Sequence, residues 1–505
     1  MAMGEGAVPL GQRALTIADV VAVARGRKAV TLDPAARRRM EAARAVVERY
    51  SSENRPAYGI THGLGSRVVK GIDRAARDDY SRVVVLARAC GAGEPLPVEA
   101  VRAALFARAA SMARAGAGVR PVIVDTQCAM LAAGVHPYVP SIGSVGASDL
   151  ALCANMALPL IGEGRAELQG KLLPGAEAMA RAGVGTVVLA EKEGLALCSA
   201  NSISVGLGAL LLADLGELIE LMEGIVVLTM EAFRANPSPL DPRVVEARSA
   251  PGQARAAASL RAKLAGSALF EPGQPRRIQD PISIRCASHV QGSLRVAVDV
   301  CLPNIEAELN GAGDNPLVLA DDDEILSNGN FHTPAMAVAF DALALSMAQA
   351  AVMASQRTAR LLQGALTDLP DSLTLRGSTH AGVGMLSLTA DTLAKEIHIL
   401  CQPASIHDAS GYNVEDHAPM TPLAVRKAVK ILGLLRQVAA CELIVAAQAF
   451  DMRKLGRAAP VARALRDAVR AKVPPLDDDR SLTEDLERVS AMVARGDLLP
   501  CLRAT

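Results

Sequence analysis

A long apolar segment, Leu207 to Phe233, constrains the fold of this chain more than any other feature. Acidic residues interrupt it at Asp214, Glu217, Glu220, Glu223 and Glu231. The first four are three residues apart, a spacing that places them along one stripe of an α-helix. Charged residues at this density are not expected in a membrane-spanning helix. The segment therefore predicts a long helix in a water-soluble bundle.

Other segments repeat the helical pattern, whereas strand signals are few. Helical periodicity with few breakers extends over Ala35–Tyr50, Val98–Ala115, Ala196–Arg234, Ala335–Leu362, His380–Cys401 and Leu423–Phe450. Aromatic residues make up only 2% of the chain, so aliphatic and small side chains must fill the core between the helices. The predicted fold class is mainly α, a bundle of long helices with a smaller mixed N-terminal region.

Charge and cysteine content limit the classes of function. Lys plus Arg and Asp plus Glu both number 53, so the chain lacks the overall basic field typical of nucleic-acid or anionic-membrane binding. We expect a small-molecule ligand. Nine cysteines without a Cys-x-x-Cys pair indicate reduced thiols in a cytoplasmic protein. Residues 1–12 show no signal-peptide pattern.

The most informative local motif is Gly143-Ser-Val-Gly-Ala-Ser-Asp-Leu150. It resembles the segment of the histidine/phenylalanine ammonia-lyase family in which Ala-Ser-Gly cyclises to 4-methylideneimidazol-5-one (MIO). Here Ser148 is followed directly by Asp149, so either the glycine is deleted or Asp149 replaces it. Glycine suits the cyclisation because it lacks Cβ. We therefore expect no MIO, and formation from Ala147-Ser148-Asp149 is the alternative.

The resemblance covers most of the chain in collinear order. Its motifs include Arg55-Pro-Ala-Tyr58-Gly-Ile-Thr, Gly134-Val-His-Pro137, Asp314-Asn-Pro-Leu317, Gly329-Asn-Phe-His332 and Glu415-Asp-His417. It implies the ammonia-lyase (fumarase/aspartase-like) fold and a homotetramer with shared active sites. We expect an N-terminal domain over residues 1–195 and a central long-helix bundle with C-terminal helices over 196–505.

The resemblance also assigns roles to individual residues. Tyr58, in a glycine-rich loop, matches the tyrosine that moves the β-proton of the substrate, and Arg285 matches the arginine that pairs with the substrate carboxylate. We predict the following set: catalytic candidates Tyr58, Ser148, Asp149 and Glu415, and substrate-binding candidates Arg88, Ser199, Arg285, Asn315 and Asn330.

Besides the triplet, other family positions differ in this chain. Ile282 stands where the family has a pocket tyrosine, and Ser199 stands where it has an asparagine. Arg88 follows Ala87 at the residue pair that selects the side chain of the substrate. A guanidinium group favours a carboxylate, phosphate or sulfonate over a phenyl ring, although Arg88 facing solvent is an equal alternative.

These observations leave three functions open. The first is MIO-free elimination, isomerisation or reverse addition on a small amino acid or related carboxylate with a polar or anionic side chain. The second is a conventional MIO-dependent histidine or aromatic amino acid lyase or aminomutase, and the third is a non-catalytic paralogue that binds a ligand or a partner subunit. No metal site is expected, because the spacing of His398, Cys401, His407 and Asp408 fits no strong zinc pattern.

Overall fold

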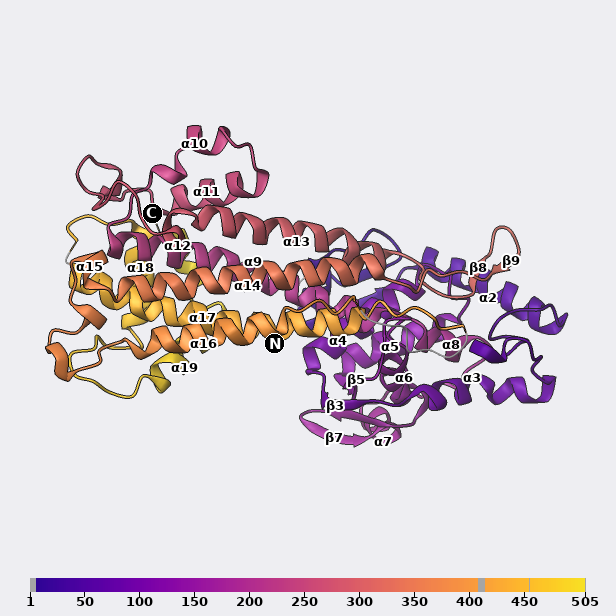
Figure 1. Ribbon diagram of the computed structural model, residues 1–505. Helices are drawn as coiled ribbons and strands as arrows, with labels where there is room; N and C mark the ends of the chain where they lie inside the picture. Colours follow the sequence, from indigo (N-terminus) through magenta and orange to yellow (C-terminus); the bar gives the residue numbers. More distant parts are fainter. Residues whose placement is uncertain (1–5, 407–413, 454, 505) are drawn as a thin grey trace. The chain divides into compact units, whose positions relative to one another are not determined.

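The computed structural model of the protein describes residues 6–406, 414–453 and 455–504. It is mainly helical, as predicted (Figure 1). The chain packs into two compact units: unit 1 comprises Met1–Ala213, Cys301–Phe340 and Pro403–Arg426, and unit 2 comprises Asp214–Val300, Asp341–Gln402 and Lys427–Thr505. The units interleave along the sequence, whereas the predicted division falls once, at residue 195, and it stays a prediction of domain organisation.

Long helices dominate the described part of the chain. They are α9 (Ser202–Phe233), α13 (Ala287–Asn310), α14 (Pro334–Leu361) and α17 (Thr421–Arg453). Each contributes residues to both units. The sequence predicted α14 and α17 to within three residues at each end, but α13 lay outside the predicted segments. Pro303 lies inside α13, and an internal proline is a helix-breaking signal that only tertiary packing can override.

The acidic stripe of α9 joins helices of unit 2 through ion pairs. The Glu223 carboxylate, fully buried, accepts from Arg295 Nη2 of α13 at 2.8 Å and from Lys263 Nζ at 3.1 Å. Asp214 lies 2.9 Å from Arg436 Nη2 of α17. The predicted stripe therefore exists, but its charges contact cations on neighbouring helices and are not simply hydrated.

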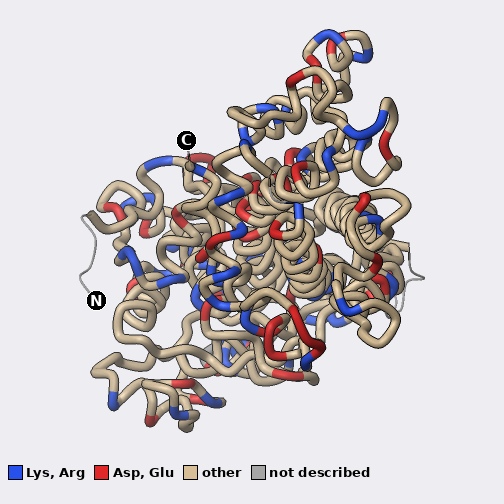
Figure 2. The backbone as a smooth tube through the Cα atoms, turned by 90° about the vertical axis from the view of Figure 1, so that its left-hand side faces the viewer, with Lys and Arg blue, Asp and Glu red and all other residues tan. Residues whose placement is uncertain are grey.

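Shorter helices complete unit 2. They are α10 (Pro242–Glu246), α11 (Pro251–Lys263), α12 (Ile282–Arg285), α15 (Gly364–Thr367), α16 (Met385–Leu400), α18 (Pro460–Arg470) and α19 (Thr483–Arg495). The helix predicted over His380–Cys401 corresponds to α16 and begins five residues later than expected. Basic and acidic residues are interleaved along the backbone (Figure 2), in agreement with the balanced composition.

Unit 1 contains the smaller mixed region that the sequence predicted. Its helices up to residue 198 are α1 (Ile17–Ala24), α2 (Pro34–Ser52), α3 (Arg74–Arg88), α4 (Val98–Met112), α5 (Pro121–Ala133), α6 (Leu150–Ala157), α7 (Gly175–Arg181) and α8 (Glu193–Cys198). Its strands are β1 (Val8–Leu10), β2 (Val30–Leu32), β3 (Ala92–Pro95), β4 (Val135–Pro137), β5 (Pro140–Ile142), β6 (Arg165–Leu168), β7 (Lys171–Pro174), β8 (Leu317–Leu319) and β9 (Glu324–Leu326).

The strands of unit 1 form small, separate sheets. β1 pairs in parallel with β2, whereas the pairs β3–β5 and β8–β9 and the sheet β4–β6–β7 are antiparallel. Helices α3, α6 and α8 pack against one another beside these strands.

The continuous helix predicted over Ala196–Arg234 is wrong at its start. The chain leaves the helical conformation at Ser199–Asn201, between α8 and α9. In this gap the Ala200 carbonyl accepts from the Asp149 amide at 2.8 Å, and the Asn201 side chain donates to Glu308 at 2.9 Å. Polar groups in the non-helical segment therefore form hydrogen bonds with distant parts of the chain. The local sequence pattern could not predict these contacts.

Two helical segments are long and apolar enough to cross a membrane by length and composition alone: Glu193–Phe233 and Pro334–Leu361. In the most apolar part of each, 94% and 67% of the residues are buried inside the protein. This burial is typical of core helices in a soluble protein.

Candidate active site

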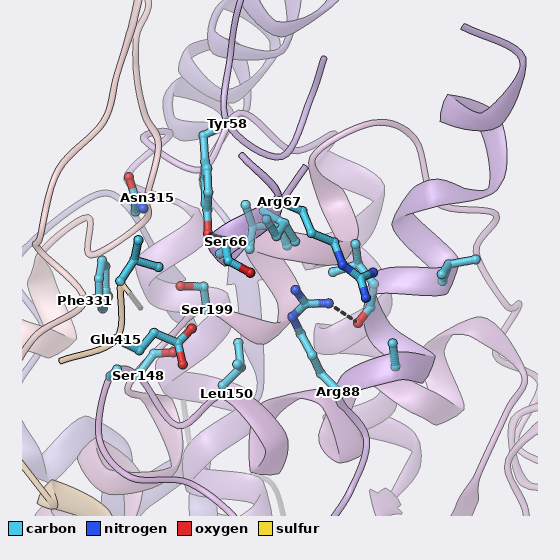
Figure 3. Close-up of a pocket in the computed structure, with 18 of the residues that line it drawn as sticks. Tyr58, Ser66, Arg67, Arg88, Ser148, Leu150, Ser199, Asn315, Phe331 and Glu415 are labelled. Carbon is cyan, nitrogen blue, oxygen red and sulfur yellow. Dashed lines mark hydrogen bonds between the residues drawn. The ribbon is translucent and has the colours of Figure 1, made fainter. Parts of the chain in front are cut away.

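A cavity of about 420 Å³ in unit 1 collects most of the predicted site residues. The predicted residues that line it are Tyr58, Arg88, Ser148, Ser199, Asn315 and Glu415 (Figure 3). Its volume falls within the range of small-molecule sites, roughly 300–1,000 Å³. The fold therefore brings together side chains from segments more than 350 residues apart in the sequence.

One face of α3 forms a wall of the cavity. Tyr80, Val84, Ala87 and Arg88 are spaced along a single helical face, and all four line the cavity. Arg88 is the last residue of α3, and its Nη1 donates to the Val84 carbonyl at 3.3 Å. Figure 3 shows its guanidinium group in the cavity. This position does not agree with the alternative in which Arg88 is a solvated charge on the outer side of its helix.

The loop that carries Tyr58 is held by backbone contacts. The Gly65 amide donates to Tyr58 Oη at 2.9 Å. Gly59 adopts a positive φ of 66°, and a Cβ at this position would lie 2.6 Å from Leu195 Cδ2. Glycine is therefore required for this turn to pack against α8. The rings of Tyr58 and Tyr80 pack against one buried cluster formed by Leu64, Val84 and Leu195.

The degenerate triplet lies at the cavity wall, just before α6. Ser148 adopts a positive φ of 62°, and its Oγ is buried without a hydrogen-bond partner in the described structure. Asp149 lies behind the wall and is 1% exposed. Its carboxylate accepts from the Ser204 amide at 2.7 Å and from Ser204 Oγ at 2.8 Å, at the first turn of α9. A carboxylate at a helix N-terminus is favoured by the free amides there.

Burial raises the pKa of Asp149 to about 6, although the hydrogen bonds from Ser204 oppose this effect. At pH values between 3.8 and about 6, Asp149 is protonated in the folded protein but ionised in the unfolded chain. The stability associated with protonated Asp149 is therefore present at low pH and lost as the pH rises through about 6.

Asp149→Asn should remove this pH dependence, because the amide keeps the shape without titrating. Relative to the variant, the wild type should lose up to ~3 kcal/mol of stability between pH 4 and pH 6 and change little above that range. Thermal unfolding of both proteins across this range measures the difference. A difference in stability between the two proteins that stays constant from pH 4 to pH 6 would show that Asp149 does not titrate in this range.

Glu415 enters the cavity from a loop tied to the triplet segment. His332 Nε2 and His417 Nδ1 lie 2.8 Å apart, and the backbone of His332 pairs with that of Ala147. Burial and the neighbouring His417 lower the pKa of His332. The Met420 amide donates to the Val145 carbonyl at 2.9 Å. The loop that carries Glu415 is thus fixed to the segment that carries Ser148.

Three predicted residues do not line this cavity. Asp149 lies behind the wall of the cavity. Asn330 is exposed, and its backbone amide donates to Asn328 Oδ1 at 2.9 Å. Arg285 lies at the end of α12, in unit 2. Its Nε is shielded from solvent and has no hydrogen-bond partner within the described ranges. The role predicted for Arg285 stays a prediction.

Among the cavity residues that sequence reasoning missed are Arg67 and Tyr80. Tyr80 is eight residues before Arg88, and helical spacing could have placed both on one face once α3 was predicted. Arg67 lies in the short 3-10 helix η1 (Gly65–Arg67), and its sequence context gave no comparable signal.

Metal ligands are not clustered in the described part of the chain, where no group of three or more His, Cys, Asp or Glu side chains could hold an ion. His407 and Asp408 lie outside the described residues. All nine cysteines are free, and burial raises the pKa of Cys153 and Cys198 to about 12, so these two are unreactive thiols near neutral pH.

Long helices together with a cavity built from a tyrosine loop and an Ala-Ser segment match the arrangement that the resemblance to ammonia-lyases, which are carbon–nitrogen lyases, implied. The chain belongs to the aromatic amino acid lyase family, whose model matches residues 15–471.

Relatives and solved structures agree with this family. The chain is 40% identical to a histidine ammonia-lyase of Symbiobacterium thermophilum over 99% of its own length and 98% of the relative. It is 29% identical to the histidine ammonia-lyase structure from Trypanosoma cruzi, with a TM-score of 0.91 and coverage of 99% and 95%. It is also similar to the ergothioneine-degrading enzyme ergothionase of Treponema denticola, solved with desmethyl-ergothioneine sulfonic acid: 27% identity, TM-score 0.93, coverage 98% and 100%.

Proposed function

We propose that this protein is an MIO-free lyase that acts on a small amino acid or related carboxylate with a polar or anionic side chain. The proposal includes elimination, its reverse (addition), and isomerisation, which combines an elimination with a re-addition. The observation that carries the proposal is the use of Asp149 as a structural residue. Its amide donates to Ala200, and its carboxylate binds the first turn of α9.

The residues at the triplet do not fit MIO formation. Cyclisation requires the amide nitrogen of the third residue to attack the Ala147 carbonyl carbon, two residues back. If Asp149 is that residue, its N–H is engaged in a 2.8 Å hydrogen bond to Ala200, and its side chain is almost completely buried. Attack would break this bond and move a buried carboxylate, which is costly without replacement partners.

An MIO-free elimination can be written with residues of the cavity. Tyr58, whose Oη accepts a hydrogen bond from the Gly65 amide, takes the β-proton of the substrate. The C–H electron pair forms the double bond, and the C–N bond breaks with its electrons leaving on the amine. Glu415 provides a negative charge for the cationic amine before it leaves. This route favours an amine that leaves more easily than ammonia, such as a quaternary ammonium group.

The nature of the relatives supports two first substrates, histidine and ergothioneine. The ergothionase structure contains a sulfonic acid, and Arg88 in this cavity is suited to an anionic group of that kind. Release of the amine and formation of an unsaturated acid, followed by absorbance and NMR, would test both substrates.

The decisive measurement on the purified protein is mass. We expect an unmodified intact mass and an unmodified peptide across Gly143 to Asp149. A deficit of two waters on this peptide would overturn the MIO-free proposal. It would support the second candidate, a conventional MIO-dependent histidine ammonia-lyase, which the 40% identity to such an enzyme favours.

We also propose a cytoplasmic homotetramer with shared sites. Ile278 is 97% exposed and Ile282 is 61% exposed close to Arg285 in the sequence, a pattern suited to packing against another copy of the chain. A second copy could bring its Arg285 to the substrate carboxylate. Native mass spectrometry of the same sample reports the subunit number, and a monomer would remove this part of the proposal.

A further inference from the structure

Two arginines share the cavity without a carboxylate partner of their own. Arg67 ends η1, in the Tyr58 loop, and Arg88 ends α3. Within the described ranges, neither guanidinium group forms an ion pair, and Arg88 donates only to a backbone carbonyl. The cavity lining contains one carboxylate, Glu415, and two guanidinium groups. Figure 3 shows both guanidinium groups away from Asn315 and Phe331.

Tyr80 lies close enough to interact electrostatically with both arginines. Burial raises the pKa of its phenol, and the two positive charges only partly oppose this effect. Tyr80 is therefore a protonated O–H donor near neutral pH. Two guanidinium groups and a phenol provide donors of the kind that binds a carboxylate or sulfonate.

We infer that Arg67, Arg88 and Tyr80 form a subsite for an acidic group, a carboxylate or a sulfonate, on the side chain of the substrate. The inference rests on the proposed function, since it assumes that the substrate occupies this cavity. Within the proposed substrate class, it favours compounds with a second acidic group besides the α-carboxylate over histidine and ergothioneine, which have only one carboxylate. It also adds Arg67 and Tyr80 to the residues that determine specificity.

The position of Arg67 couples this subsite to the catalytic tyrosine. Arg67 belongs to the same short helix as Gly65, whose amide donates to Tyr58 Oη. Arg88 lies on α3, which packs against α8. An acidic group that bridges the two arginines would hold the loop against α3. Substrate binding would thereby fix the hydrogen bond to Tyr58.

The test compares succinate with butyrate, which has the same four carbons but only one carboxylate. Isothermal titration of the full-length protein should give at least about 10-fold tighter binding of succinate, the effect expected for hydrogen bonds to a charged group. Arg67→Gln and Arg88→Gln should each remove most of this preference, and Tyr80→Phe should reduce it. Arg74→Gln is the matched control, because Arg74 is exposed on α3 and does not line the cavity.

Hydrogen exchange provides a second measurement that does not depend on activity. Succinate should slow exchange over residues 59–70 in the wild type, and butyrate should not. In Arg67→Gln the slowing should be lost. Equal affinity for the two acids, or an equal effect of Arg74→Gln, would overturn the subsite.

The subsite and the proposed function fail in different ways. Equal binding of succinate and butyrate beside measurable elimination of a neutral substrate would reject the subsite alone. A succinate preference that depends on both arginines supports the subsite whatever the mass measurement shows, because binding does not require an MIO. Selective binding without turnover of any substrate would reject the lyase proposal and leave the subsite standing.

Discussion

Tyr58→Phe should lower kcat by about 10²–10⁴, the range that one positioned acid or base contributes. The phenylalanine ring can still pack against Leu64 and Leu195, so folding should be preserved. The hydroxyl that accepts from the Gly65 amide is lost, and with it the group that we propose takes the β-proton. Steady-state kinetics with the substrate found in the elimination assay measures the effect.

A suitable control for this prediction is Tyr138→Phe. Tyr138 packs under the guanidinium group of Arg165 and does not line the cavity. Removal of the Tyr138 hydroxyl should change kcat by less than about 3-fold, because this residue lies away from the cavity. If Tyr58→Phe also retained nearly full kcat, Tyr58 would not be the base.

Asp314→Asn should destabilise the protein by about 3–5 kcal/mol, the cost of removing one partner from a buried ion pair. Arg108 Nη2 donates to Asp314 Oδ1 at 2.7 Å, and the two side chains are 1% and 2% exposed. Lys192 is also completely buried nearby, where burial lowers its pKa to about 8 and Asp314 opposes this effect. The asparagine would leave these buried cations without their carboxylate.

The change should appear as a lower urea midpoint and a smaller soluble fraction on expression. Asp323→Asn is the comparison, because Asp323 and its partner Arg49 are about half exposed. A surface pair of this kind contributes at most about 1 kcal/mol. Similar small losses in both variants would mean that the Arg108–Asp314 pair is not important for stability.

The cavity combines a rigid wall with a loop suited to closure. α3, α6 and α8 pack together and carry Arg88, Leu150 and Leu195 into the lining. The Tyr58 loop packs against this wall at Gly59 and through the Tyr58 ring, and one hydrogen bond, from Gly65 to Tyr58, lies within the loop. Val69 in the same loop is 82% exposed. In the proposed reaction the base, Tyr58, lies on this loop and the binding group, Arg88, lies on a helix, so the substrate would complete the site when it binds.

The secondary structure that the sequence predicted best was the long amphipathic or apolar helix. Periodicity located α14 and α17 closely, because their own residues satisfy the helical pattern over many turns. It failed at Ser199–Asn201, where the amide of Asp149, far away in the sequence, donates a hydrogen bond to the Ala200 carbonyl and no helix forms. It also failed at α13, where local chemistry at Pro303 opposes the helix and packing favours it.

For the site, motif resemblance selected individual residues as candidates but did not predict how they meet. It selected Tyr58, Arg88 and Ser148, all of which line one cavity. It could not select Arg67 or Tyr80, because neither belongs to a motif that the sequence made visible. It could not place Asp149 behind the cavity wall, since that depends on the first turn of α9.

The sequence by itself determined the helical class, the family resemblance and the departure at Ser148-Asp149. These properties depend on residue order and local periodicity, which are present in the chain before it folds. Only the tertiary structure decided that Arg67, Tyr80 and Arg88 line one cavity and that Asp149 supports α9. Such relations depend on distances between segments far apart in the chain, and these distances are set by packing and by the hydrogen bonds that buried polar groups require.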